Sequence, residues 1–230
     1  MVFMAEVETL KEEKLPFKKI YAAYIIFLIA QLCLTVSVGA FGSRFKFLPR
    51  WLENFALFAL LGYVLCFIST LMLKKYSKQF YYSFITAIIL GVTSIVDDIC
   101  MNSTDGLYLA WGKGLVWSID FIEAVFFGYF FQGTYLLFSE YGHKQGAKKT
   151  KGYVISFAVL FSVKIIVTLF SKFPFIINNI VTNRVFVYSS WILDFVFYIY
   201  ILVITIICFV YIHKINKKEG DSNEEVSEIH

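Results

Sequence analysis

Charged residues are scarce in this sequence of 230 residues: Lys, Arg, Asp and Glu make up 17% of it, against about a quarter in an ordinary soluble domain. Hydrophobic residues reach 59% and are gathered into long runs. Such runs predict helices that cross a bilayer, and they argue against a large soluble core. The chain has room for about six spans and for no separate soluble domain.

Proline is absent from every hydrophobic run. The three prolines, Pro16, Pro49 and Pro174, all lie between the runs, so each run can form an unbroken helix. Transport sites often lie on helices that are interrupted by Gly or Pro. This absence therefore counts against a transporter of that kind.

Paired cysteines, metal-ligand spacings and enzyme motifs are also missing. The four cysteines form no CxxC pair, and the three histidines lie in polar segments without zinc-ligand spacing. There is no P-loop, no GxSxG, no HExxH and no dinucleotide fingerprint. Asp120 and Glu123 are paired carboxylates of a kind that does acid–base work, but nothing else specifies a reaction. We predict no cofactor and do not favour an enzyme.

The hydrophobic runs predict an all-α, polytopic integral membrane bundle of about six transmembrane helices with short loops. The spans are expected at about 20–40, 55–73, 80–99, 114–138, 152–171 and 187–212. Residues 1–19 form an N-terminal segment, and residues 139–151 form a basic loop. Residues 213–230 are charged and are expected to be a disordered tail.

The distribution of Lys and Arg predicts the orientation. Fourteen of them lie in the N-terminal segment, the second and fourth loops and the tail, and six lie in the other loops. The positive-inside rule therefore places both ends in the cytoplasm of a multi-pass protein of the cell membrane. The first loop, with Arg44, Lys46 and Arg50, is the main exception. Because the basic residues flank the runs, we expect contact with lipid and no binding of nucleic acid.

Four ionisable residues lie deep within the predicted spans. Counted from the third and fifth loops at about 1.5 Å per residue, Asp120 is about 9 Å deep, Asp194 about 10 Å, Lys164 about 12 Å and Glu123 about 13 Å. Asp98 lies near the rim of the same side. Because charges in hydrocarbon are costly, we expect these five residues to meet inside the bundle as a ligand or ion site.

Five further residues are candidates for lining this site. The third span carries small and polar residues on one helical face, and this face includes Ser94 and Asp98. Trp117, Trp191 and Tyr198 lie near the acids and are able to add cation–π contacts, as is Phe121. Gln31 is the one strongly polar residue of the first span. The candidate lining is therefore Gln31, Ser94, Trp117, Trp191 and Tyr198.

The charge balance indicates what the site binds. Five acids, with Asp97 included, face the single Lys164, and each uncompensated charge costs several kcal/mol in a dry site. Either some acids are protonated, or water or a bound cation joins them. Protons, metal cations and organic amines all remain open. Two alternatives also remain: each charge reaches the headgroups separately, or Lys164 pairs with one acid as a purely structural contact.

We therefore expect a small transporter, or the membrane subunit of one, for a small cation, a proton or an organic amine. The alternative is a sensory or regulatory subunit that binds an extracytoplasmic ligand and signals to a cytoplasmic or membrane protein partner. A third interpretation is a structural or immunity-type membrane protein without a true site.

Overall fold

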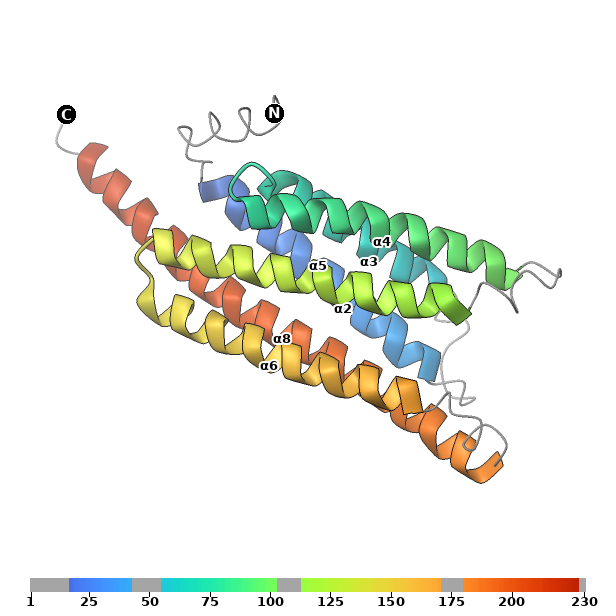
Figure 1. Ribbon diagram of the computed structural model, residues 1–230. Helices are drawn as coiled ribbons and strands as arrows, with labels where there is room; N and C mark the ends of the chain where they lie inside the picture. Colours follow the sequence, from blue (N-terminus) through green and yellow to red (C-terminus); the bar gives the residue numbers. More distant parts are fainter. Residues whose placement is uncertain (1–16, 43–54, 103–112, 171–179, 228–230) are drawn as a thin grey trace, which may run out of the picture.

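The computed structural model describes residues 17–42, 55–102, 113–170 and 180–227, which contain six helices and no strands. The helices are α2 (Phe17–Gly42), α3 (Phe55–Leu73), α4 (Lys78–Asn102), α5 (Lys113–Glu140), α6 (Lys144–Phe170) and α8 (Ile180–Ser227) (Figure 1). Five of them are long and apolar enough to cross a membrane, and α3 contributes a shorter apolar stretch, Phe58–Leu73. The predicted helical membrane bundle is confirmed.

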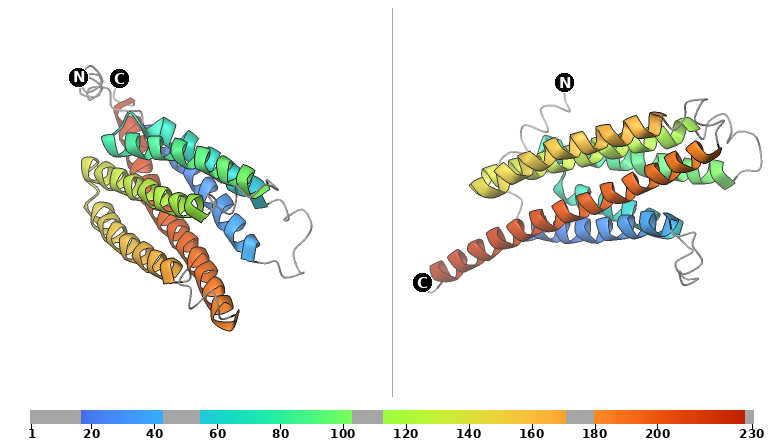
Figure 2. Two further views of the ribbon diagram at one scale, coloured as in Figure 1. Left: turned by 45° about the vertical axis from the view of Figure 1, so that its right-hand side comes forward. Right: turned by 90° about the horizontal axis from the view of Figure 1, so that it is seen from below.

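The six helices form a closed ring. Successive helices run antiparallel, so that α2 begins and α8 ends at one end of the bundle, which we call the terminal end (Figure 1). At the opposite end α4 ends and α5 begins. Each helix packs against the next one, and α8 returns to pack against α2 (Figure 2). The first and last helices are thereby neighbours, and the ring encloses one interior.

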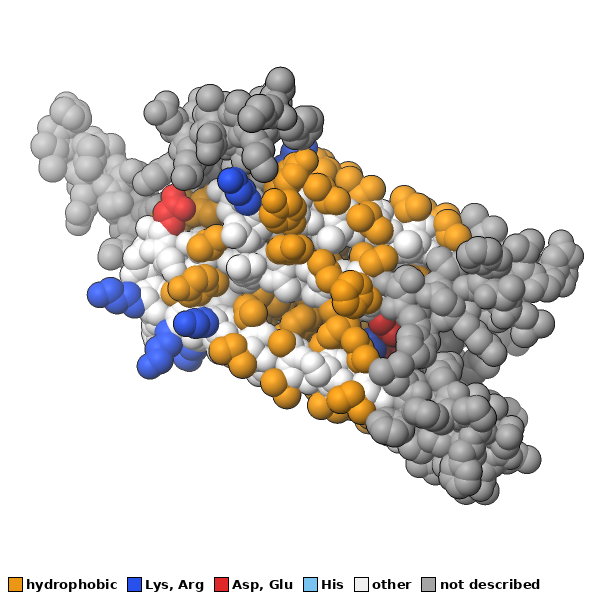
Figure 3. Space-filling model, viewed as in Figure 1, with side chains coloured by type: hydrophobic (Ala, Val, Ile, Leu, Met, Phe, Trp, Pro, Cys, Tyr) orange, Lys and Arg blue, Asp and Glu red, His pale blue; other side chains and the backbone are white. Residues whose placement is uncertain are grey.

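The outer surface of the ring is apolar. Side chains such as Val92, Ile155 and Val159 are more than half exposed. Hydrophobic side chains cover the middle of the face shown in Figure 3, and lysines gather towards the terminal end. An exposed apolar belt is the surface that a membrane-spanning bundle presents to lipid.

Aromatic side chains fill the interior. The ring of Phe27 on α2 stacks on that of Phe130 on α5, with 3.6 Å between centroids. One turn away, the hydroxyl groups of Tyr24 and Thr134 are hydrogen-bonded at 2.6 Å. The hydrophobic effect does not drive helix association in lipid, so close packing and hydrogen bonds of this kind must hold α2 against α5.

The face of α4 that carries small residues packs inward over part of its length. Ser83 and Ala87 are buried, and the Ser83 hydroxyl donates to the carbonyl oxygen of Phe126 on α5 at 3.4 Å. Further along this face, a Cβ atom at Gly91 would meet nothing within 4 Å. The face predicted from the sequence is thus tightly packed near its beginning and leaves open space beside Gly91.

The connection between α5 and α6 is shorter than predicted. Gly142 has a positive φ of 66°, which reverses the chain after α5. The Nδ1 atom of His143 then accepts a hydrogen bond from the backbone N–H of Gly146 at 3.0 Å and caps α6. Because of this cap, α6 begins at Lys144, and most of the expected basic loop over 139–151 is helical.

The last helix is longer than the predicted sixth span. A disordered tail was expected over 213–230, but α8 continues to Ser227, and residues 228–230 lie outside the described residues. This segment contains no proline, and its Lys, Glu and Ile residues tolerate a helix well. The helix that carries Asp194 therefore extends to the terminal end of the bundle and beyond it.

Candidate functional site

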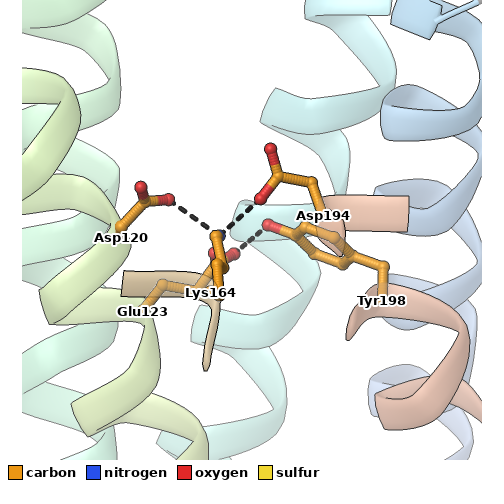
Figure 4. A network of polar contacts seen from close by, with 5 residues as sticks. All are labelled: Asp120, Glu123, Lys164, Asp194 and Tyr198. Atoms are coloured by element: carbon orange, nitrogen blue, oxygen red, sulfur yellow. Dashed lines mark hydrogen bonds and ion pairs between the residues drawn. The ribbon is translucent and has the colours of Figure 1, made fainter. Parts of the chain in front are cut away.

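Lys164 of α6 joins three helices. Its side chain is 5% exposed, and its Nζ atom lies 2.9 Å from Asp120 Oδ1 of α5 and 2.9 Å from Asp194 Oδ1 of α8 (Figure 4). The ammonium group donates a well-aligned hydrogen bond to Asp120, whereas Asp194 Oδ1 has no hydrogen bond of good geometry, so that contact is an ion pair. The ring of Phe197 lies 5.1 Å from Nζ and adds a cation–π contact.

Glu123 is the most deeply buried of the acids whose side chains the structure describes. It lies one turn from Asp120 on α5 and is 2% exposed. The Tyr198 hydroxyl of α8 donates a hydrogen bond to its Oε1 atom (Figure 4). Tyr63 of α3 lies within electrostatic reach of Glu123 and beside Tyr198. We call Asp120, Glu123, Lys164, Asp194 and Tyr198 the charged centre.

A second polar pair lies between α2 and α3. Gln31 is 0% exposed, and its Nε2 atom donates to Cys66 Sγ at 3.5 Å. Its Oε1 atom is buried without a hydrogen-bond partner, as is the hydroxyl oxygen of Ser94. Cys66 in turn lies within electrostatic reach of Glu123. The polar interior therefore continues from the charged centre towards α2.

The charged centre is partly exposed through its two aspartates, whereas Glu123 and Lys164 are buried. The side chains of Asp120 and Asp194 are 28% and 32% exposed and lie nearer the opposite end of the bundle. One to two turns towards the terminal end, the buried rings of Phe127, Phe131 and Phe157 pack together, with centroids 6.1 to 6.3 Å apart. We call these three rings the aromatic layer. It lies between the charged centre and the terminal end.

The structure brings together four of the five predicted site residues: Asp120, Glu123, Lys164 and Asp194. Of the candidate lining, Tyr198 contacts Glu123, Gln31 lies beyond Cys66, and Ser94 is partly buried on α4. Three predicted residues remain: the fifth site residue, Asp98, and two of the candidate lining, Trp117 and Trp191. Their backbones lie in α4, α5 and α8, and their side chains are outside the described residues.

Three neighbours of the charged centre were missed by the sequence analysis. Phe197 lies one turn from Asp194, so that spacing could have predicted its contact with Lys164. The sequence favoured Phe121 for a cation–π contact, but this side chain is 59% exposed. Tyr63 and Cys66 lie on α3, whose run carries no charge that would draw attention to them.

The charged centre is acidic overall. Three carboxyl groups and one ammonium group carry a net charge of −2 when all are ionised, and −1 when one carboxyl is protonated. Among the residues whose side chains are described, no group of three or more His, Cys, Asp and Glu is placed to hold a metal ion. Asp120 and Asp194 converge on the ammonium nitrogen of Lys164 instead.

The fold and the centre define a class: a multi-pass helical membrane protein with a buried, acid-rich polar centre. Comparisons with protein-family models, with curated proteins and with solved structures find no match for the chain.

Proposed function

We propose that the charged centre binds a small cation and moves it across the membrane. The observation that carries this proposal is the convergence of three carboxyl groups and one ammonium group from α5, α6 and α8 inside the candidate spans. Charges at this depth are costly and persist where they serve a pathway for ions or protons. The aromatic layer fits a state in which the site communicates with one side only.

Transport is testable with the purified chain in proteoliposomes. A pH-sensitive dye inside the vesicles reports proton flux, and labelled methylammonium reports uptake of an organic amine. We expect Asp194→Asn and Glu123→Gln to abolish the flux that the parent shows. Glu140→Gln, the same chemical change at the far end of α5, serves as the matched control. Equal flux in the parent and both site variants would reject the proposal.

A sensory or regulatory subunit is the second candidate, and the length of α8 favours it. One continuous helix carries Asp194 and Tyr198 and extends to Ser227 beyond the terminal end. A ligand that shifts Asp194 would move this helix as a rigid rod and present the movement to a protein partner. Copurification from native membranes tests the idea, because a chain that always elutes alone would be unable to signal in this way.

The proposed setting is the cell membrane, with both ends in the cytoplasm. The excess of Lys at the terminal end supports this orientation, since Lys18, Lys74, Lys144 and Lys214 all lie there. The charged centre then faces the extracytoplasmic side through Asp120 and Asp194. Tags at the two ends should both be protected from protease added to intact cells.

A further inference from the structure

The charged centre already holds one cation of its own. The ammonium of Lys164 lies at hydrogen-bonding distance from Asp120 and in ion-pair contact with Asp194, and it faces the ring of Phe197. These are the contacts that an organic ammonium ligand would seek in an acidic, aromatic site. A second ammonium at this position would first have to displace Lys164.

Glu123 differs from the two aspartates because, among the side chains that the structure describes, no cation lies within ion-pair distance of it. Its hydrogen-bond partner is the neutral hydroxyl of Tyr198. The titratable groups that face it are Asp120 on the same helix, Lys164 on α6 and Asp194 with Tyr198 on α8, together with Tyr63 and Cys66 on α3. Lys164 is shared between two aspartates, so it cannot fully compensate a third carboxylate.

The packing around Glu123 suits a proton better than a larger cation. Glu123 is 2% exposed, and its neighbours Cys66 and Tyr198 are buried too. Phe127, one turn along α5, closes the side that faces the aromatic layer. A proton needs no cavity, because it forms one O–H bond on an oxygen that is already present. A buried carboxyl group without a cation is also less costly when it is neutral.

We infer that the cation handled by this protein is a proton and that Glu123 is the group that binds it. This inference rests on the proposed transport function and names its substrate. In the loading step, a hydronium ion that arrives past Asp120 and Asp194 transfers its proton to Glu123 and leaves one water molecule. In a second conformation that is open to the terminal end, Glu123 transfers this proton to a water molecule, which leaves as a hydronium ion. The net charge of the centre alternates between −1 when Glu123 is protonated and −2 when it is ionised.

Infrared difference spectroscopy of the protein in lipid, recorded as the pH is changed, tests this inference without a transport assay. A protonated carboxyl group has a C=O stretching band that a carboxylate lacks. We expect a band from a buried carboxyl in the parent and in Glu140→Gln, and its loss in Glu123→Gln. In Tyr198→Phe the band should remain and move to higher frequency, because the hydrogen bond to Oε1 is removed.

Glu123→Asp guards against a folding defect in the glutamine variant, since it should keep a buried carboxyl band at a shifted frequency. A band that survives unchanged in Glu123→Gln would overturn the inference, as would its absence from the parent. The result is independent of flux. If the band depends on Glu123 but the parent vesicles carry no flux, the assignment of the proton stands and the transport proposal fails.

Discussion

At the scale of single residues, Lys164 occupies the place that a bound cation would take between two aspartates. A buried ion pair adds little stability compared with apolar residues of similar size in its place. Removal of one partner, however, leaves an uncompensated buried charge and destabilises the protein. Lys164→Met removes the ammonium group and keeps an apolar stem of similar length. In Lys164→Met, Asp120 and Asp194 would therefore lose the ammonium group that compensates their charge.

We expect Lys164→Met to destabilise the protein by about 3 kcal/mol, the low end of the range for a broken buried pair, because both aspartates are about one-third exposed. Adding Asp120→Asn and Asp194→Asn to this variant should restore most of the lost stability. Thermal unfolding in detergent measures both effects. A Lys164→Met variant as stable as the parent would mean that the ammonium group does not hold these helices together.

A second prediction concerns Tyr76, which lies between α3 and α4 at the terminal end. Its hydroxyl donates a hydrogen bond to Glu140 Oε2 at 2.8 Å. Burial of the Tyr76 side chain and the neighbouring Glu140 carboxylate both raise the pKa of Tyr76 above its usual value. At neutral pH we expect Tyr76→Phe to cost about 1 kcal/mol, less than the loss of a buried hydrogen bond to a charged group, because this hydrogen bond is exposed to solvent.

The effect of Tyr76→Phe should depend on pH. A raised pKa in the folded state means that the contribution of Tyr76 is fully present below about pH 10, the value for an unfolded chain, and is lost as the pH rises further. The stability difference between the parent and Tyr76→Phe should therefore shrink above about pH 10. Urea titrations at neutral and alkaline pH compare the two, and a difference that stays constant would contradict the assigned environment.

Sequence reasoning found the acids and Lys164 because charged residues in an apolar run are conspicuous. It also placed them at one height, since depth follows from residue count along a helix. It could not determine which acids pair with Lys164 and which acid accepts a hydrogen bond from Tyr198. That division depends on the rotation of α5, where Glu123 faces the interior and Asp120, one turn away, lies nearer the rim.

At the scale of elements, replacing two glycines of α5 by alanine should have opposite effects on stability. A Cβ atom at Gly133 would lie 2.9 Å from the buried ring of Phe80 on α4, whereas one at Gly128 would meet nothing within 4 Å. Phe80 also packs against Phe130, which leaves its ring little freedom to move. Gly133 therefore sets the distance between α4 and α5.

We expect Gly133→Ala to destabilise the protein by about 1–3 kcal/mol through overpacking. Gly128→Ala should be neutral or stabilising by up to about 1 kcal/mol, because alanine is the better helix former. Thermal unfolding of the two variants side by side provides the measurement and its matched control. Equal effects of the two substitutions would show that α4 and α5 do not pack as described.

Helix boundaries were predictable where hydrophobicity ends abruptly, as at Phe55 and Leu73 of α3. They were missed where a helix continues through charged residues. The beginning of α6 depends on the cap provided by His143, a residue type that is not a usual helix cap. The end of α8 passes through a charged segment that contains Gly220 but no proline. Hydrophobic patterning detects the part of a helix that lies in lipid and not the part that extends into water.

At the scale of the whole molecule, the closed ring explains how costly groups are tolerated. The outer face is apolar over its middle, and an acidic and a basic side chain are visible near the opposite end (Figure 3). The ionisable side chains meet where α5, α6 and α8 adjoin. The aromatic layer lies between these side chains and the terminal end. The sequence predicted six antiparallel helices but could not predict the closure of α8 against α2, because contacts between distant segments leave no local pattern.

The central claim is that one ammonium nitrogen is shared by two carboxyl groups inside the bundle. Solid-state NMR of the protein in lipid bilayers, with 15N in lysine and 13C in the aspartate carboxyl groups, measures these contacts through dipolar coupling. We predict strong coupling of one lysine Nζ to two carboxyl carbons, with one coupling lost in Asp120→Asn and the other in Asp194→Asn. Absence of both couplings, or their persistence in both variants, would contradict the claim.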